Sequence, residues 1–293
     1  MIITNVLGGL GNQMFQFAAG LGVSLRTGSR VMVDNSGFRG YSLHNGYELD
    51  SVFDGVPDVA TPADVRRVLG VRGLRPLRRL LSGRWTGILR PKALILEPSL
   101  AFWPDLLTLR EPSYLLGYWQ SAGYFSDCAP AVRKAFAFRA SLSGKAASWA
   151  AAMRSTESVS VHVRRGDYAS SPNASAFHGT LPLAYYERAA ALVRSLHGEA
   201  RFFVFSDDLD WARAHLTFIA DAHFVDGNEG AAAHRDLQLM TLCQHSIIAN
   251  SSLSWWGAWL GERPRQMVVA PRQWFRNFPI EDTGRIPEEW TLL

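Results

Sequence analysis

Apolar runs of strand length alternate along the chain with amphipathic segments of helical length. Val159, Val161 and Val163, for example, alternate with Ser160 and His162, which is the period of a β-strand. Strands are predicted at residues 1–6, 30–34, 114–119, 158–163, 201–206, 222–226, 246–249 and 266–270. Helices are predicted at residues 12–26, 128–138, 143–154, 182–196, 208–216, 232–243 and 252–261.

This alternation predicts an α/β fold whose parallel sheets are covered by helices on both faces. The chain has 293 residues, enough for one large or two ordinary domains. We place a domain boundary near residue 155, which gives domains 1–155 and 156–293. Residues 35–110 have a less regular pattern. Because such folds bind ligands at the carboxyl ends of their strands, the polar residues that follow each strand are the candidate site.

Two adjacent arginines, Arg164 and Arg165, follow the strand at 158–163. Guanidinium groups match phosphate oxygens bidentately, which favours an anionic ligand. Neighbouring residues on an extended chain face opposite ways, so we expect one arginine to contact the ligand and the other to hold the loop. Alternatively, both are surface residues that pair with Asp167.

The stretch LGGLGNQ places Gly8, Gly9 and Gly11 between the first strand and a helix. Glycines let a backbone approach a ligand closely, and the helix amino terminus attracts anions. The third glycine of a dinucleotide fingerprint and the Gly-Lys-Ser/Thr of a P-loop are both absent. Asn12 and Gln13 add polar groups beyond what a helix cap needs, so we expect a phosphate or sugar contact here, with a plain tight turn as the alternative.

The strand at 201–206 ends in Ser206, Asp207 and Asp208, just before a helix. A helix cap and an acidic first turn explain part of this cluster. A carboxylate such as Asp207 also suits the N–H edge of a purine or a ribose hydroxyl. Asp208 and Asp210 form an acid-x-acid pattern that some sugar-nucleotide enzymes use to hold a divalent metal.

The strand at 246–249 runs into a polar cluster at the start of a helix. The cluster consists of Asn250, Ser251, Ser252 and Ser254. One hydroxyl would suffice as a cap, so the surplus predicts an anion cradle of N–H and O–H groups. The helix also carries Trp255, Trp256 and Trp259, whose spacing places them on one face and favours core packing over stacking on a substrate.

The formal charge is +4 and the pI is about 9.3, and much of the excess lies in residues 64–92, which hold nine Lys/Arg against Asp64 alone. This stretch is either a solvated surface or a docking face for an anionic membrane. No pattern of a nucleic-acid module is present, and no apolar run reaches the length of a membrane span. The start lacks the features of a signal peptide, and Cys128 and Cys243 match no metal or redox spacing. We therefore expect a cytoplasmic protein, with peripheral contact at the inner membrane face if the basic stretch docks.

Five motifs, in order, give the chain a family resemblance. They are GGLGNQMFQFA, GYWQSAGYF, HVRRGDY, FSDDLDW and DLQLMTLCQHSIIANSSLSWWGAWL. In this order they resemble the bacterial α-1,2-fucosyltransferases. The resemblance implies two Rossmann-like domains facing across a cleft (GT-B type), with GDP-L-fucose as the donor and no metal requirement. It also implies inverting transfer of fucose to the 2-hydroxyl of a galactoside in a surface glycan, with the nucleotide held by the carboxyl-terminal domain and the acceptor mainly by the other.

The resemblance also suggests roles for single residues. Arg164, Ser251 and Ser252 would stabilise the departing diphosphate, while Gly9, Gly11 and Asn12 would approach the fucose or the phosphates. Asp167 is the first candidate for the proton acceptor, with His162 and His178 as alternatives.

Three other functions stay open at this point. The first is a different fucosyl linkage, α-1,6 or O-fucosyl. The second is a metal-dependent transferase of the single-sheet type that uses Asp208 and Asp210. The third is a protein that binds a GDP-sugar without catalysis. No metal-binding cluster is recognisable, because none of five histidines considered (His162, His178, His223, His234 and His245) forms an i, i+4 pair with a glutamate.

Overall fold

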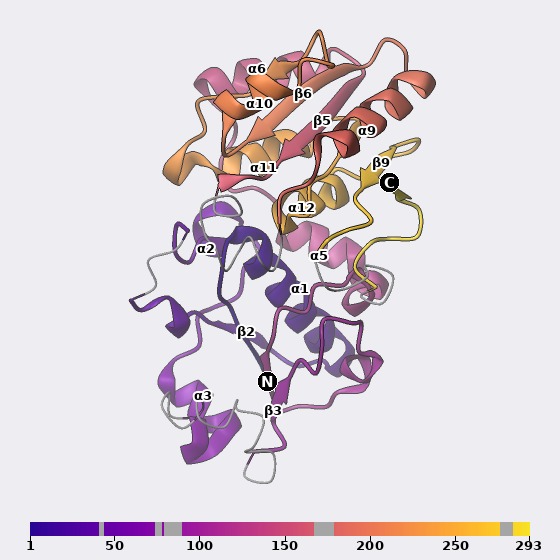
Figure 1. Cartoon of the computed structure of the whole chain (residues 1–293). Helices are drawn as coiled ribbons and strands as arrows, with labels where there is room; N and C mark the ends of the chain where they lie inside the picture. Colours follow the sequence, from indigo (N-terminus) through magenta and orange to yellow (C-terminus); the bar gives the residue numbers. More distant parts are fainter. Residues whose placement is uncertain (41–43, 74–77, 79–89, 167–178, 276–283) are drawn as a thin grey trace. The chain divides into compact units, whose positions relative to one another are not determined.

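The computed structural model describes residues 1–40, 44–73, 78, 90–166, 179–275 and 284–293 (Figure 1). The chain divides into two compact units. Unit 1 comprises Met1–Arg139 and Thr283–Arg285, and unit 2 comprises Ala140–Asp282 and Ile286–Leu293. Each unit contains its own parallel sheet, which confirms the predicted α/β class.

The sheet of unit 1 has the strand order β2-β1-β4-β3, and its recorded pairings are parallel. Its strands are β1 (Ile2–Asn5), β2 (Val31–Asp34), β3 (Leu94–Leu96) and β4 (Ser113–Leu116). Its described α-helices include α1 (Leu10–Thr27), α2 (Leu49–Val52), α3 (Pro62–Leu69) and α5 (Ala129–Ala135). Short 3-10 turns connect them at η1 (Ser36–Phe38), η2 (Gly70–Gly73), η4 (Pro104–Thr108), η5 (Ala122–Tyr124) and η6 (Ser126–Cys128). The strand β3 escaped the sequence pattern because it is short and lies in the irregular region.

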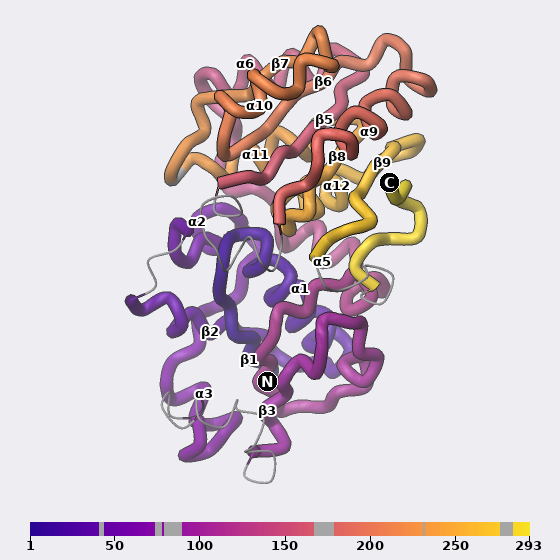
Figure 2. The backbone as a smooth tube through the Cα atoms, in the orientation of Figure 1, coloured from indigo at the N-terminus to yellow at the C-terminus, as the bar shows by residue number. Residues whose placement is uncertain are grey.

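The sheet of unit 2 has the strand order β10-β9-β8-β5-β6-β7 (Figure 2). Its strands are β5 (Ser158–Val163), β6 (Arg201–Ser206), β7 (His223–Phe224), β8 (His245–Ile247), β9 (Val268–Ala270) and β10 (Thr291–Leu292). Its described helices include α6 (Gly144–Arg154), α9 (Leu183–Leu196), α10 (Leu209–His215), α11 (His234–Met240), α12 (Ser252–Leu260) and the 3-10 turn η7 (Gly230–Ala232).

Helices cover both faces of the unit 2 sheet. The β5 valines Val159 and Val161 pack in one buried cluster with Ala189 of α9. Phe203 and Phe205 of β6 pack in a second cluster with residues of α6 and α11. Because alternate side chains of a strand point to opposite faces, a sheet with both faces buried favours apolar residues at nearly every position. The strand β6 has them at residues 202–205, whereas β5 alternates its valines with the buried Ser158, Ser160 and His162.

The units divide between Arg139 and Ala140, earlier than the boundary predicted near residue 155. The difference is the helix α6, which the sequence assigned to the first domain. Its residues Ala146, Ala150 and Met153 are buried in the second cluster of unit 2. The buried apolar face of an amphipathic helix decides which unit the helix packs in, and its position in the chain does not.

The basic stretch 64–92 is described only in part, and residues 74–77 and 79–89 lie outside the described residues. One of its arginines, Arg78, is buried and bonds Asp34 at the end of β2, with Nη1 to Oδ2 at 2.7 Å. Tyr114 also donates to Asp34, at 2.5 Å. Docking to a membrane stays a prediction for the stretch, but Arg78 belongs to the interior of unit 1. Within the part of the chain that the structure describes, no helix has both the length and the apolarity to cross a membrane.

The two ion pairs of this region predict very different stability effects. The Arg78–Asp34 pair is 10% and 3% exposed, whereas Arg67–Asp64 is 73% and 17% exposed. Substituting Arg78→Met strands a buried carboxylate, which costs about 3–5 kcal/mol of unfolding free energy. The control Arg67→Met breaks an exposed pair and costs at most about 1 kcal/mol. Equal losses in urea unfolding would contradict this account.

Candidate functional site

The strand order of unit 2 creates a topological switch point between β5 and β8. From β5 the chain proceeds through β6 to β7 on one side, and then returns to β8 on the other side of β5. Ligands of open α/β sheets bind at the carboxyl ends of strands at such a reversal. The predicted polar residues after β5, β6 and β8 therefore follow three neighbouring strands of one sheet.

Asp207 connects the loop after β5 with the end of β6. Its Oδ1 accepts the backbone N–H of Arg165 at 2.8 Å, and its Oδ2 pairs with Nη1 of Arg164 at 2.9 Å. A Cβ placed on Gly166 would lie 2.6 Å from Oδ2, so the close approach requires the glycine. In this structure Asp207 organises the arginine loop, a role that the sequence did not predict.

The two arginines divide their work. Arg165 lies flat on the indole of Trp211, with its guanidinium carbon 3.8 Å from the ring centroid, and its Nε is 3.6 Å from Oδ2 of Asp208. This is the loop-holding contact expected for one arginine of the pair. Arg164 is held by Asp207 and keeps a quarter of its side chain exposed. Of the two arginines, Arg164 therefore stays the candidate for the predicted anion contact.

The other residues after β6 shape the start of α10. Ser206 Oγ accepts the N–H of Asp208 at 3.0 Å, and Asp208 Oδ1 caps the helix by accepting the N–H of Trp211 at 3.1 Å. The capping interpretation of Asp208 is thus confirmed. Both side chains therefore stabilise the start of the helix. This weakens the prediction that Ser206 contacts the substrate and that Asp208 binds a metal.

The amino terminus of α12 differs from that of α10 because no side-chain cap bond is present at its N-cap residue, Ser251. Ser254 Oγ donates to the carbonyl of Ser251 at 3.2 Å. Asn250 is buried, and its Nδ2 donates to the carbonyls of Gly179 and Trp274 at 3.1 and 3.3 Å. Asn250 and Ser254 therefore hold the turn, and the anion-binding prediction is left with Ser251, Ser252 and the first N–H groups of the helix.

The tryptophans of α12 form part of the core. Trp255 and Trp256 are fully buried and Trp259 is 7% exposed. Trp255 stacks on Trp259 at 6.0 Å and also contacts Trp290. The predicted packing role is confirmed, and these rings hold the helix rigidly behind its amino terminus.

His162 is buried in β5, and burial lowers its pKa from 6.5 to about 4; Asp207 opposes and Arg164 reinforces this shift. Because its side chain is buried in the strand, the geometry argues against His162 as the proton acceptor. The other two candidates for this role, Asp167 and His178, lie outside the described residues.

The glycine-rich loop belongs to unit 1, and it is partly a tight turn. Gly8 has φ +86°, which favours glycine, and Gly9 is the N-cap of α1 without a side-chain cap bond. Gln13 is fully buried: its Nε2 donates to the carbonyls of Gly8 and Gly46 at 2.9 and 2.8 Å. Gln13 is therefore a structural residue rather than the predicted substrate contact. Asn12, in contrast, is only partly buried.

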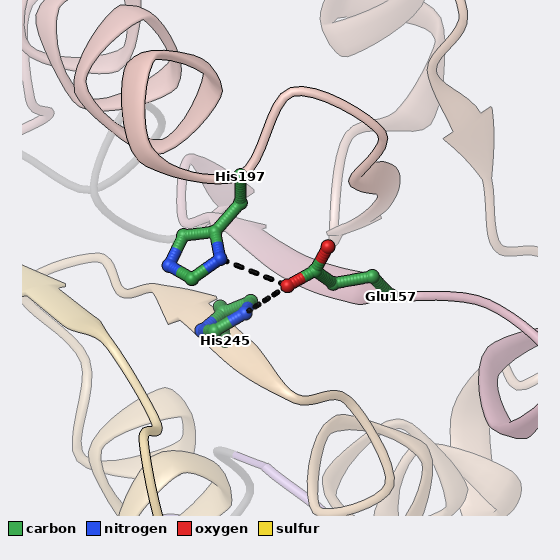
Figure 3. Close-up of side chains that lie close together, drawn as sticks. All are labelled: Glu157, His197 and His245. Atoms are coloured by element: carbon green, nitrogen blue, oxygen red, sulfur yellow. Dashed lines mark hydrogen bonds and ion pairs between the residues drawn. The ribbon is translucent and has the colours of Figure 1, made fainter.

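Glu157, His197 and His245 come together at the opposite edge of the unit 2 sheet, where β5 and β8 begin (Figure 3). Glu157 Oε1 lies 2.8 Å from His197 Nδ1 and 3.4 Å from His245 Nε2. Nδ1 of His245 accepts the N–H of Met267 at 3.0 Å, so the neutral ring carries its proton on Nε2 and directs it at Glu157. A metal would need the lone pair at that atom, so this arrangement suits a hydrogen-bonded cluster better than a cation site.

Two residues that hold the loops at these strand ends were not predicted from the sequence. Trp211 and Gln16 both lie inside motifs that gave them no predicted role. Gln16 accepts the N–H of Leu7 at 2.9 Å and donates to the carbonyl of Gly117 at 3.1 Å, which ties the loop after β1 to the end of β4. The second glutamine of GNQMFQ, one helical turn after the first, was the available signal.

The buried His162 predicts how stability responds to acid. Its folded pKa lies below the unfolded value, so the unfolded chain binds a proton that the native chain refuses as pH falls from 6.5 toward 4. The unfolding free energy should fall there by up to about 1.4 kcal/mol per pH unit from this group. His162→Gln should remove that share of the slope while leaving the slope above pH 7.5 unchanged, as measured by denaturant unfolding at several pH values. An unaltered acid slope would contradict the assignment.

Comparisons with known proteins agree with this geometry. Residues 105–292 match the family described as Glycosyl transferase family 11. An α-1,2-colitosyltransferase of Escherichia coli is 31% identical over 100% of this chain and 99% of its own length. The O-antigen biosynthesis glycosyltransferase WbnK of Escherichia coli is 31% identical over 92% of this chain and 93% of its own. A bovine galactoside α-(1,2)-fucosyltransferase 1 is 34% identical over 35% of this chain and 29% of its own.

Two solved structures share the fold. The α-1,6-fucosyltransferase NodZ soaked with GDP-fucose superposes with a TM-score of 0.53 at 17% identity, over 92% of this chain and 94% of that one. A mutant of Arabidopsis thaliana FUT1 in complex with GDP superposes with a TM-score of 0.52 at 10% identity, over 91% of this chain and 69% of that one. The predicted GT-B type of fold is thereby confirmed. Given the family match and the full-length bacterial relatives, the chain belongs to glycosyl transferase family 11.

Proposed function

We propose that this glycosyltransferase is an inverting fucosyltransferase that moves L-fucose from GDP-L-fucose to the 2-hydroxyl of a galactoside in a surface glycan. The observation that carries the proposal is the placement of two anion-attracting features after neighbouring strands. The part-exposed Arg164 follows β5, and α12, whose N-cap residue Ser251 makes no side-chain cap bond, follows β8. Both features attract anions, and a nucleoside diphosphate is an anion of matching size and charge.

Departure of GDP leaves negative charge on the diphosphate as the donor bond breaks. Arg164, Ser251 and Ser252, with the first N–H groups of α12, would stabilise that charge by hydrogen bonds that are already oriented before the reaction. Because these groups supply the positive potential that a divalent cation provides elsewhere, we propose that transfer requires no metal. Asp208 is one of the two carboxylates that the metal-dependent alternative requires. Because it caps α10 instead, it also supports a mechanism without a metal.

The acceptor hydroxyl must lose its proton as it attacks the sugar. We propose Asp167 for this role, with His178 as the alternative. Asp167 follows directly after the arginine loop that Asp207 fixes. The side chain of His162 is buried within β5, and this burial favours Asp167 over that histidine.

The identity of the transferred sugar is the open part of the proposal. One full-length bacterial relative is named a colitosyltransferase, and colitose is L-fucose without its 3-hydroxyl. The relatives from mammals are named galactoside α-(1,2)-fucosyltransferases, and they match about a third of this chain. We favour fucose because the motifs of the chain resemble fucosyltransferases, and a donor comparison separates the two sugars.

A donor and acceptor comparison tests the activity directly. With GDP-L-fucose and lactose, the purified chain should form fucosyl-lactose whose linkage, determined by NMR, is α-1,2 to galactose. An excess of EDTA should change the rate less than twofold. Preference for GDP-colitose would correct the donor alone, and loss of activity in EDTA would overturn the metal-free mechanism. Failure to transfer either sugar to a panel of galactosides, with no free sugar released, would favour the non-catalytic alternative.

Binding and chemistry should separate in two variants. Arg164→Ala removes a charge-assisted contact worth roughly 1.5–3 kcal/mol, so GDP should bind about 10- to 100-fold more weakly in calorimetry. Asp167→Asn should keep GDP binding and lower kcat by about 10²- to 10⁴-fold. The control Arg194→Ala removes an arginine that pairs with Asp221 away from the strand ends, and it should bind GDP normally. Wild-type GDP affinity in Arg164→Ala would refute the anion site.

A further inference from the structure

A chain of three polar side chains connects the glycine-rich loop to two distant segments of unit 1. Nε2 of Gln120 donates to Oδ1 of Asn12 at 2.6 Å. Nη1 of Arg285 in turn donates to Oε1 of Gln120. Arg285 is fully buried and lies 165 residues from Gln120 in sequence. The contact joins the end of the chain to the motif after β4.

The charged end of this chain determines the direction of every hydrogen bond in it. A guanidinium group only donates, so Gln120 must turn its oxygen toward Arg285 and its nitrogen toward Asn12. Asn12 must then offer its oxygen to Gln120, which leaves its Nδ2 on the other side of the amide. That nitrogen lies beside Gly8, since a Cβ on Gly8 would be 2.9 Å from it. Among the residues that the structure describes, no hydrogen bond is recorded for Nδ2 of Asn12.

The backbone around Gln120 is held in an unusual conformation. Trp119, the preceding residue, has φ +55°, which is rare for a bulky side chain and costs roughly 1–3 kcal/mol. Glu97, just after β3, accepts the N–H groups of Tyr118 and Trp119 at 2.7 and 2.9 Å. A Cβ on Gly117 would lie 2.4 Å from Cβ of Glu97, so the carboxylate reaches this turn only past a glycine. The turn thus fixes where Gln120 begins.

The position of Arg285 is fixed by the same turn. Ser121 Oγ donates to the carbonyl of Gly284 at 2.6 Å, and Gly284 has φ +58°. Burial raises the pKa of Glu97, and the guanidinium of Arg285 partly offsets that effect. The guanidinium of Arg285 therefore interacts with residues of two other segments, Glu97 after β3 and Gln120 after β4, and it orients the amide of Gln120.

The chain of side chains ends at the topological switch point of the unit 1 sheet. From β1 the chain proceeds to β2 on one side, and β4 lies on the other side of β1. Asn12 follows β1 and Gln120 follows β4, so their hydrogen bond spans the two strand ends where an open α/β sheet binds its ligand.

We propose that Arg285 and Gln120 are positioning residues that fix the hydrogen-bond polarity of Asn12, so that Asn12 presents its Nδ2 donor to an oxygen of a bound sugar or phosphate. This inference rests on the proposed transferase function and names residues to which that function gave no role. The oxygen belongs either to the GDP-sugar or to the acceptor glycan, and kinetic measurements tell the two apart.

The variant Gln120→Glu tests the direction of the hydrogen bond to Asn12 separately from the stability of the fold. A carboxylate keeps the contact with Arg285 and strengthens it by charge, so the melting temperature should not fall. It donates nothing to Asn12, which must turn its Nδ2 inward and present an oxygen instead. We expect kcat/KM to fall about 10- to 100-fold, as for loss of a directed hydrogen bond plus a repulsive contact. The control Gln238→Glu makes the same charge change on α11, where Nε2 bonds the carbonyl of Ala140, and should keep wild-type kinetics.

A double-mutant cycle distinguishes this role from general support of the fold. If Gln120 acts through Asn12, then Gln120→Glu should cost nothing further in a chain that already carries Asn12→Ala. The substrate whose KM rises in Gln120→Glu identifies the source of the oxygen: the GDP-sugar or the galactoside. Additive losses, or wild-type kcat/KM in a folded Gln120→Glu, would overturn the proposal.

A measurement without turnover keeps this inference separate from the proposed function. The side-chain NH₂ signals of Asn12 and Gln120 can be assigned by their loss in Asn12→Asp and Gln120→Glu. We expect Gln120→Glu to shift the Asn12 signals, because the amide turns over, and Gln238→Glu to leave them in place. Unshifted Asn12 signals would refute the relay. Absence of sugar transfer by the wild type, with the shift present, would count against the proposed function alone.

Discussion

Both sheets obey one constraint: parallel strands joined by crossovers leave an open strand end wherever the chain reverses direction. In unit 2 the reversal separates β5 from β8, and in unit 1 it separates β1 from β4. The loops after these strands are the ones that no crossover needs to cover, so they are free to carry function. In each unit the polar loops follow these strand ends: the arginine loop in unit 2 and the glycine-rich turn in unit 1.

Within the described part of unit 2, the carboxylate of Asp207 orients the arginine loop at the open strand ends. Asp207 holds Arg164 by its side chain and Arg165 by its backbone, and thereby fixes where the positive charge lies. The guanidinium of Arg165 instead packs over the ring of Trp211. Arg164 thus follows β5 with its direction set by Asp207, and α12 follows the neighbouring strand β8. This is the arrangement on which the proposed stabilisation of a leaving diphosphate rests.

The two units carry different chemical groups at their open strand ends. Unit 2 offers a charged group and a helix terminus, which suit an anion. Unit 1 offers the amide of Asn12, whose direction is set by Gln120 and by a guanidinium buried two contacts away. Neutral donors with a fixed direction suit sugar hydroxyls, which are themselves neutral and differ only in position.

The sequence by itself determined the main strands and helices, because a buried strand such as β5 and a capped helix such as α10 leave local patterns. It also determined which strand ends carry polar residues. Only the tertiary structure decided what each of these residues does: Asn12 and Gln13 are neighbours in one motif, yet Gln13 is fully buried and Asn12 is not. Likewise, nothing local connects Arg285 with Gln120 across 165 residues, because that contact exists only once the segment containing Arg285 has packed into unit 1.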